Sequence, residues 1–321
     1  MRRRLAFIIT AIISLPPWSA IVAAATMLTF AAVSTSEKSL RVAVLDFGEA
    51  AQGQRVADLF ATSLVKAPAD TTTNIGMRVA LLDRGMSRAA ARGVGYRGSL
   101  NLALGEARDL GAAVGCDFII IGDAQTIRRS SLAKPIYYET YASIFVVSAR
   151  TGRLVAWERP AFEAATPEAA EGALFAELRL VAARQLTRII GEFQAETTLP
   201  RAAAIAGDEG APEVIDLTTA ELDDTKHSDV RPPLPYRRLR PPYPDTAARA
   251  EAEATVDVTV DIGADGEVTR VEVIRWAGFG LDDAVIETVR QLHFRSATRA
   301  GAPVPVRVLL RYNFRRPPKS N

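Results

Sequence analysis

Side chains that could do chemistry are few and widely spaced in this sequence. It holds one cysteine, Cys116, and two histidines, His227 and His293. A histidine metal site or a Ser-His-Asp triad needs such residues to converge, and two histidines leave little material for either. We therefore predict no catalytic residue and no metal site. Cys116 lies beside an apolar run, and we expect it to be a buried packing residue.

Two short motifs imitate nucleotide-binding signatures. Gly93–Gly98 has the G-x-G-x-x-G spacing, but a dinucleotide loop must follow a strand directly, and residues 86–92 have a helical, Ala/Arg-rich pattern. Asp46-Phe-Gly48 imitates a kinase element without the other kinase motifs. Four aspartates fall at the ends of expected strands or helices, where this residue commonly caps and turns: Asp46, Asp83, Asp117 and Asp123. We predict no cofactor and no enzymatic activity.

The composition is that of an ordinary globular protein. Hydrophobic residues make up 48% and charged residues 24%, and a net charge of +2 gives no reason to expect nucleic-acid binding. A single cysteine excludes an intrachain disulfide. The 321 residues suit two domains plus connections, at roughly 100–200 residues per domain.

The N-terminus has the pattern of an export segment. Arg2, Arg3 and Arg4 precede an uncharged run over residues 5–33. Positive charges before such a run keep the N-terminus in the cytoplasm, and the chain that follows the run is exported. The run is long enough to cross a hydrocarbon core of about 30 Å, although two prolines interrupt it. We predict a membrane anchor at residues 1–34, and hence a single-pass inner-membrane protein with periplasmic domains. The alternative is a cleaved signal peptide and a periplasmic protein.

Residues 40–195 alternate strand and helix patterns, which predicts an α/β domain with a mixed sheet and helices. Short apolar or alternating runs predict the strands, and apolar spacing of three and four predicts the helices. The expected strands are residues 41–47, 79–82, 118–121, 138–147 and 153–157. The expected helices are residues 56–65, 86–92, 100–110 and 167–193.

The next stretch, residues 196–232, loses this periodicity. Its first 35 residues, 196–230, hold nine acidic and two basic residues with scattered Ala, Gly, Thr and Pro. Low hydrophobicity with one-sided charge is typical of an extended, flexible linker. We therefore predict a domain boundary here.

Residues 233–316 predict a small α+β domain with a three-stranded antiparallel sheet and two helices. A short helix at 245–252 precedes a hairpin at 254–274, and a helix at 281–292 precedes the last strand. The last strand places six residues on one apolar face: Val304, Val306, Val308, Leu310, Tyr312 and Phe314.

The order of these pieces resembles the TonB C-terminal family. The matching pieces are Tyr243-Pro244, Val256–Ile262, Asp265-Gly266, Val271–Ile274, Gly280–Asp282, His293–Thr298, Gly301–Val306 and Phe314. Two departures occur. Trp276-Ala277-Gly278 stands where many members carry paired serines before the glycine, and Phe294-Arg-Ser-Ala297 stands where many have Phe-x-Pro-Ala. Neither is expected to damage the fold, and Trp276 is expected to pack rather than to contact a partner.

The first domain, residues 40–195, resembles the CsgG-like family of bacterial envelope proteins. The residues that carry the resemblance are Val42–Phe47, Val79–Arg84 and Ala107–Gly122. The last stretch carries most of it, since a helix passes through Leu-Gly and Gly-x-Asp into an apolar strand. The resemblance implies a periplasmic module.

The TonB resemblance implies a protein that links the inner membrane to outer-membrane transporters in support of energy-dependent transport. Such domains bind a transporter peptide as an added strand, and an open sheet edge has the unpaired backbone groups for this. The predicted contacts are the lead-in Arg237, Arg238, Arg240, Tyr243 and Pro244 and the strand residues Val304, Val306, Arg307, Val308 and Leu310.

Several alternatives stay open. The family couples to proton-driven motor subunits in the inner membrane through a histidine that residues 5–33 lack, so a motor partner is a second expectation beside the transporter. The other functional hypothesis is a non-transducing envelope assembly or secretion scaffold whose CsgG-like domain forms a homo-oligomer. The last strand is either a binding edge, a central strand or an edge that a dimer occupies.

Overall fold

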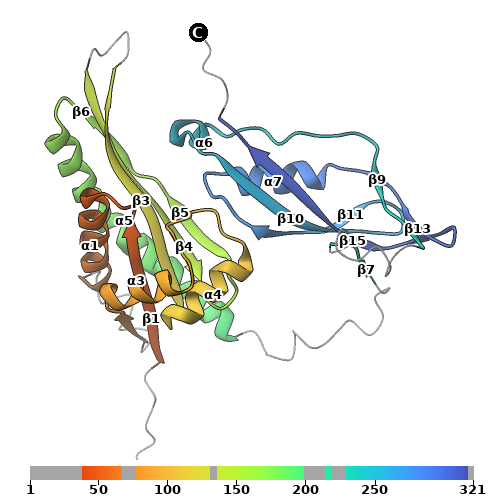
Figure 1. Ribbon diagram of the computed structural model, residues 1–321, viewed down its shortest axis with the longest axis horizontal. Coiled ribbons are helices and arrows are strands. Elements are labelled where there is room, and N and C mark those ends of the chain that lie inside the picture. Colours follow the sequence, from red (N-terminus) through yellow and green to blue (C-terminus); the bar gives the residue numbers. More distant parts are fainter. Residues whose placement is uncertain (1–37, 67–76, 131–135, 199–213, 219–228, 317–321) are drawn as a thin grey trace, which may run out of the picture. The chain divides into compact units, whose positions relative to one another are not determined.

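A six-stranded mixed sheet forms the N-terminal part of the protein (Figure 1). The computed structural model describes residues 38–66, 77–130, 136–198, 214–218 and 229–316. The strands are β1 (Lys38–Phe47), β2 (Met77–Leu81), β3 (Phe118–Arg129), β4 (Tyr137–Ser148), β5 (Leu154–Glu158) and β6 (Ala161–Ala164). The order is β2-β1-β3-β4-β5, with β6 also paired to β4. β2, β1 and β3 are parallel, whereas β4 is antiparallel to β3, β5 and β6.

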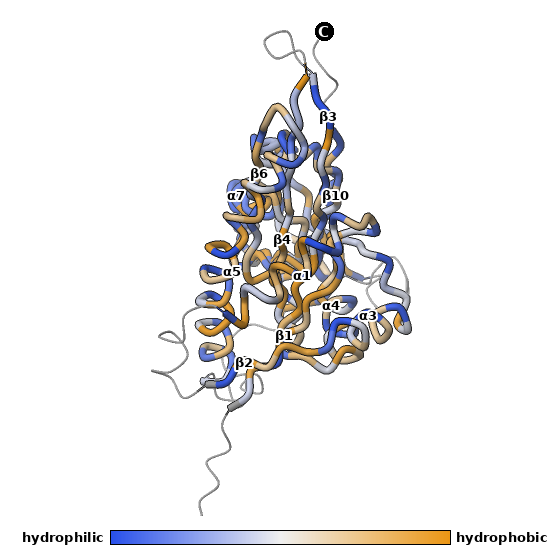
Figure 2. Tube along the Cα trace, turned by 90° about the vertical axis from the view of Figure 1, so that its left-hand side faces the viewer, coloured by the Kyte–Doolittle hydropathy of each residue, from blue (hydrophilic) through white to orange (hydrophobic). Residues whose placement is uncertain are grey.

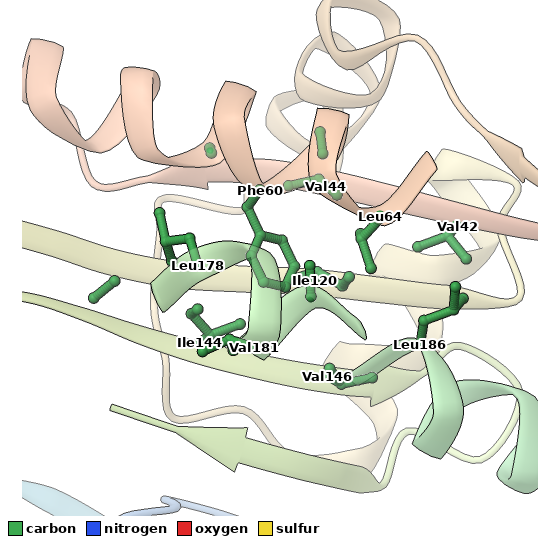
Figure 3. Packing of buried hydrophobic residues seen from close by; sticks show 14 of the residues in the cluster. Val42, Val44, Phe60, Leu64, Ile120, Ile144, Val146, Leu178, Val181 and Leu186 are labelled. Atoms are coloured by element: carbon green, nitrogen blue, oxygen red, sulfur yellow. The ribbon is translucent and has the colours of Figure 1, made fainter. Parts of the chain in front are cut away.

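Two helices cover one face of this sheet and form the main core with it. They are α1 (Ala51–Lys66) and the long α5 (Pro167–Thr198). In Figure 3, Phe60 of α1 and Leu178 and Val181 of α5 lie against Ile120 and Ile144 of the sheet. Along α5 apolar and polar residues alternate by the turn (Figure 2), so that one face is buried and the other is hydrated.

The second face of the sheet packs against α3 (Arg84–Gly93) and α4 (Leu104–Val114). Asp83 caps α3, because its side chain accepts a hydrogen bond of 2.8 Å from the Met86 amide. Cys116 is 7% exposed within this second core, as expected from the sequence, and burial raises the pKa of its thiol to about 12.

The β3–β4 hairpin is longer than the apolar runs indicated. Its ladder of paired residues extends to Arg129 and Tyr137, although polar side chains begin at Asp123. Thr126 and Thr140 meet across it at 2.9 Å, and Thr140 is fully buried. Polar residues that pair across two strands also stabilise a hairpin, in addition to the burial of apolar residues. A hydropathy pattern does not show which polar residues will pair in this way.

A second, smaller sheet forms the C-terminal part, in the order β11-β10-β15-β7. Its strands are β7 (Ile215–Asp216), β10 (Ala254–Ile262), β11 (Val268–Arg275) and β15 (Val306–Phe314). The helices α6 (Asp245–Ala250) and α7 (Leu281–Arg290) accompany it. Five short strands form two further small sheets, β12-β9 and β14-β13-β8: β8 (Val230–Arg231), β9 (Leu234–Pro235), β12 (Phe294–Arg295), β13 (Ala297–Arg299) and β14 (Ala302–Val304).

This arrangement modifies the predicted three-stranded sheet. The strands β11, β10 and β15 are antiparallel neighbours, but β7 adds a fourth, parallel strand beside β15. β7 comes from residues 214–218, inside the stretch predicted to be a linker. The predicted last strand is also divided, because β14 ends at Val304 and β15 begins at Val306, with Pro305 between them. Proline has no amide hydrogen, so it cannot donate to a continuous ladder.

The sheet of the C-terminal part contacts the N-terminal part through an aromatic cluster. Trp276 is 2% exposed and stacks on Phe145 of β4, with ring centroids 6.0 Å apart. Its indole nitrogen donates to the Gly152 carbonyl oxygen at 3.0 Å. Phe279 contacts the rings of both Phe145 and Trp157. Trp276 therefore packs in the second core of the N-terminal part.

Polar contacts reinforce this junction. Asn101 donates to the carbonyl oxygens of Thr255 and Trp276 at 2.8 and 2.6 Å, and it accepts from the Thr255 amide at 3.1 Å. Arg275 forms an ion pair with Glu106 of α4. The two predicted domains are thus joined by specific contacts, and residues 37–321 group as one compact unit.

The predicted membrane anchor, residues 1–34, lies outside the described residues. Among the helices that are described, none is both long and apolar enough to cross a membrane. The longest, α5, carries charged residues along its exposed side and its buried side packs in the core. The expectation of a single-pass inner-membrane protein is corrected accordingly.

Candidate partner-binding edge

The strand β15 is positioned by a long antiparallel register with β10. Val258 lies opposite Leu310, Val260 opposite Val308, and each pair faces the C-terminal core. Successive side chains of a strand point to opposite faces, so the even-numbered residues of β15 are apolar and face α7 and the core. The predicted alternation is confirmed over residues 306–314.

The opposite face of β15 is polar and carries two bidentate ion pairs. Arg307 binds the Asp261 carboxylate with contacts of 2.6 and 2.8 Å, and Arg311 binds the Asp257 carboxylate at 2.7 and 3.1 Å. The hydrogen bonds from Arg307 to Asp261 raise the pKa of Arg307. Asp257, only 4% exposed, also pairs with Arg275. Charged, planar pairs of this kind hold β15 in register on β10.

The outer side of β15 is partly covered. Ile215 and Leu217 of the β7 segment donate to the carbonyl oxygens of Pro305 and Arg307, at 3.1 and 2.8 Å. Backbone groups alternate sides along a strand, so the odd-numbered residues of β15 direct their amides and carbonyls outward. Beyond Arg307, no strand within the described ranges pairs with this outer side. Leu309 is the first residue beyond β7 whose backbone faces outward.

The predicted strand contacts occupy four kinds of position. Val306 is fully buried, and its backbone groups face β10 rather than the outer side. Arg307 is held by Asp261, and Val308 and Leu310 face the core while staying partly exposed. Val304 belongs to β14, where it pairs with Ala297 of β13. The structure thus brings four of these five residues together on β15 and places Val304 on a separate hairpin.

The predicted lead-in residues also divide. The Tyr243 hydroxyl donates to the Ala252 carbonyl oxygen at 2.6 Å, its ring lies 6.3 Å from that of Phe314, and burial raises its pKa. Pro244 is the N-cap residue of α6. Tyr243 therefore fastens the lead-in to the end of β15. The three predicted arginines lie on the segment between β9 and Tyr243, and their side chains are exposed: Arg237, Arg238 and Arg240.

Two features of this region were missed in the sequence. The β7 strand lies in an acidic stretch, and only the short alternation Ile215-Asp216-Leu217 marks it. Asn101 stands in a loop before α4, with no pattern that shows its contacts with Thr255 and Trp276. Over the described residues there is no group of three or more His, Cys, Asp or Glu side chains placed to hold a metal.

Helix, hairpin, helix and strand, with an outward-facing last strand, define a small sheet domain of the kind that can accept an added strand. The family model "Gram-negative bacterial TonB protein C-terminal" matches residues 240–315. The match covers residues 240–315 alone, so the similarity to a TonB C-terminal domain holds for this part of the chain. The predicted resemblance is confirmed for this part of the chain. No curated protein sequence gives a significant match to the chain.

Several solved structures are similar to part of the chain. The C-terminal domain of TonB from Pseudomonas aeruginosa is 22% identical, with a TM-score of 0.24, and the match covers 30% of this chain and 95% of that one. The hypothetical protein CT253 from Chlamydia trachomatis is 10% identical, with a TM-score of 0.32, over 48% of this chain and 98% of that one. Lipoprotein GNA1162 from Neisseria meningitidis is 14% identical, with a TM-score of 0.26, over 46% and 97%. The CsgG-like resemblance of residues 40–195 stays a prediction.

The expected contact with inner-membrane motor subunits falls on residues 5–33. These residues lie outside the described ranges.

Proposed function

We propose that this protein binds an extended peptide of an outer-membrane TonB-dependent transporter along the outer side of β15, in support of energy-dependent transport. The observation that carries the proposal is the edge itself. β7 already pairs with the first two residues of β15, and the outward-facing backbone from Leu309 onward continues the same edge. Main-chain hydrogen bonds supply the affinity of strand addition, and side-chain pockets supply the specificity.

The side chains around this edge favour a bound peptide in which polar and apolar residues alternate. Arg307 and Arg311 line one face of β15, and Leu310 and Tyr312 line the other. A guest strand places its own alternate side chains on these same two faces. Acidic residues on one face and apolar residues on the other would match them.

The test is a titration of the full chain with peptides from the N-termini of outer-membrane transporters of the same organism. Leu309→Pro removes an outward amide without removing a hydrogen bond to β10, so we expect at least about tenfold weaker binding by this variant. The exposed Met86→Ala, on α3 of the N-terminal part, serves as the control and should bind within about twofold of the wild type. Equal binding by wild type and Leu309→Pro, or no binding of any peptide, would reject strand addition at this edge.

A second function, an oligomerising envelope scaffold, is favoured by the β3–β4 hairpin. β1 pairs with β3 only as far as Gly122, and β3 continues to Arg129 with β4 on its other side. In the described part of the chain, residues 123–129 of β3 have no strand on the side that β1 occupies earlier. Light scattering over a range of concentrations tests it. A mass that is a multiple of the monomer's supports the scaffold, and a monomer at every concentration argues against it.

A further inference from the structure

The β7 segment, residues 214–218, occupies the beginning of the proposed binding edge in the manner of a ligand. It runs parallel to β15, with Ile215 opposite Val306 and Asp216 opposite Arg307. Among the described strands β7 pairs only with β15, and the amides of Ile215 and Leu217 donate to the carbonyl oxygens of Pro305 and Arg307 at 3.1 and 2.8 Å. It is joined to the rest of the protein through residues 199–213 and 219–228, which are not described.

The side chains of β7 use the same two faces that a guest would use. Ile215 is 8% exposed and belongs to the C-terminal core, and Leu217 packs against that core from its border. Asp216, between them, lies on the face of Arg307, and its charge contributes to raising the pKa of Arg307. Asp216 also accepts hydrogen bonds from the Thr218 amide and hydroxyl at 2.9 and 2.6 Å, which turns the chain away after the strand. The pattern apolar-acidic-apolar is therefore matched to this edge.

We propose that residues 214–218 are a built-in competitor, a resident strand that a partner peptide with alternating apolar and acidic residues must displace from β15. The inference rests on the proposed function in one respect, namely that β15 is the docking edge. Because the resident strand is tethered, it competes at a high effective concentration although its contact is short. A partner then binds only the fraction of molecules in which the strand has left, and its apparent affinity is its intrinsic affinity multiplied by that fraction.

The probe is a fluorescently labelled peptide with the sequence of residues 212–219, titrated by anisotropy into the full chain. The released variant is Ile215→Ser with Leu217→Pro, which removes the buried side chain and one of the two amide donors. The matched control is Val214→Ser, a substitution one residue away at a side chain that is 39% exposed. We expect the released variant to bind the probe at least about tenfold more tightly than the wild type and the control.

A second probe tests the acidic position. In the peptide, the aspartate that corresponds to Asp216 is replaced by lysine. We expect about three- to fivefold weaker binding to the released variant in dilute buffer, and a smaller difference at high salt, because the exposed charge of Arg307 is screened. If the two probes bind equally at low salt, the aspartate at this position does not contribute to recognition by β15.

Hydrogen exchange on the full chain gives a readout that needs no peptide. We expect the amides of Ile215 and Leu217 to be protected in the wild type and in Val214→Ser. In the released variant, which carries Ile215→Ser, we expect the backbone amide at position 215 to exchange freely. The amides of β10 and β15 should stay protected in all three proteins. Three outcomes would each reject the proposal that residues 214–218 compete for β15. They are equal probe binding by the wild type and the released variant, no probe binding by either protein, and no protection of the Ile215 and Leu217 amides in the wild type.

The outcome is separable from the proposed function. If the resident peptide binds the released variant but no transporter peptide does, the strand site stands and the assignment of its partner fails. If transporter peptides bind the wild type and the released variant with equal affinity, the proposed function stands and the resident strand is not a competitor.

Discussion

Single residues stabilise the contact between the C-terminal domain and the rest of the molecule, and Trp276 is one of them. Its ring fills the second core of the N-terminal part, and its indole nitrogen is satisfied by Gly152. We expect Trp276→Ala to lower the free energy of unfolding by about 3–5 kcal/mol, since a buried aromatic side chain leaves a cavity. Chemical denaturation measures it. Tyr236→Ala, at a side chain that is 71% exposed, is the control and should change stability by less than about 0.5 kcal/mol.

Asp282, at the start of α7, makes stability depend on pH. Burial raises the pKa of its carboxyl group to about 6, although the amides of Ala277 and Gly278 donate to the ionised form. The unfolded group titrates near 3.8. Between these values the folded state binds more protons than the unfolded state, so this group's contribution falls as the pH rises from about 4 to about 6.

The substitution Asp282→Asn removes this titration. Relative to the wild type, we expect the variant to gain up to about 3 kcal/mol on going from pH 4 to pH 7, because two pKa units correspond to about that free energy. Denaturation of both proteins at the two pH values gives the difference. Asp283→Asn, at the exposed neighbouring carboxylate, is the control. A stability difference for Asp282→Asn that is the same at both pH values would contradict the assignment.

At the scale of elements, the strand β15 has one side bonded to β10 and another that faces outward. Proline distinguishes the two sides. We expect Leu310→Pro to cost about 2 kcal/mol or more, since it removes a hydrogen bond to β10 and the packing of a half-buried side chain. Leu309→Pro should cost less than about 1 kcal/mol, because its amide faces outward. Thermal unfolding of the two variants is the measurement, and a larger loss for Leu309→Pro would reverse the assignment of sides.

The elements themselves were largely predictable. Periodicity alone predicted β1, α1, α5, the β10–β11 hairpin and α7, because each buries a single apolar face. It predicted β4 to within one residue at each end but underestimated β3, which continues past Ile121 to Arg129, and it missed β6 and β7. A strand of two residues in an acidic stretch has almost no pattern of its own, and its pairing depends on a neighbour some 90 residues along the chain.

For the whole molecule, the junction between the two predicted domains determines whether they unfold together. Asn101 bonds both Thr255 and Trp276 through one side-chain amide. We expect the wild type to unfold in a single calorimetric transition over residues 37–321. Asn101→Ala should lower the free energy of unfolding by about 1–3 kcal/mol, because it leaves buried backbone groups unpaired, and should separate the transition into two.

Asn313→Ala provides the comparison for this experiment. Asn313 is exposed, and its side chain accepts a hydrogen bond from the Thr255 hydroxyl within the sheet of the C-terminal domain, so the lost bond does not cross the junction. We expect a loss of no more than about 1 kcal/mol and a single transition. Two separate transitions in the wild type would show that the contacts through Asn101 and Trp276 do not couple the domains.

The amino-acid order by itself determined the local elements, the position of the TonB-type domain and the apolar and polar faces of its last strand. These properties depend on hydrophobic periodicity and turn chemistry within about 15 residues, which are present in the chain before it folds. Only the tertiary structure decided which strand edge stays open, that Arg307 is already paired with Asp261, and that Ile215 lies on β15. Each of these depends on a contact between residues far apart in sequence, and such a contact forms only when the packed fold brings both backbones within hydrogen-bonding distance.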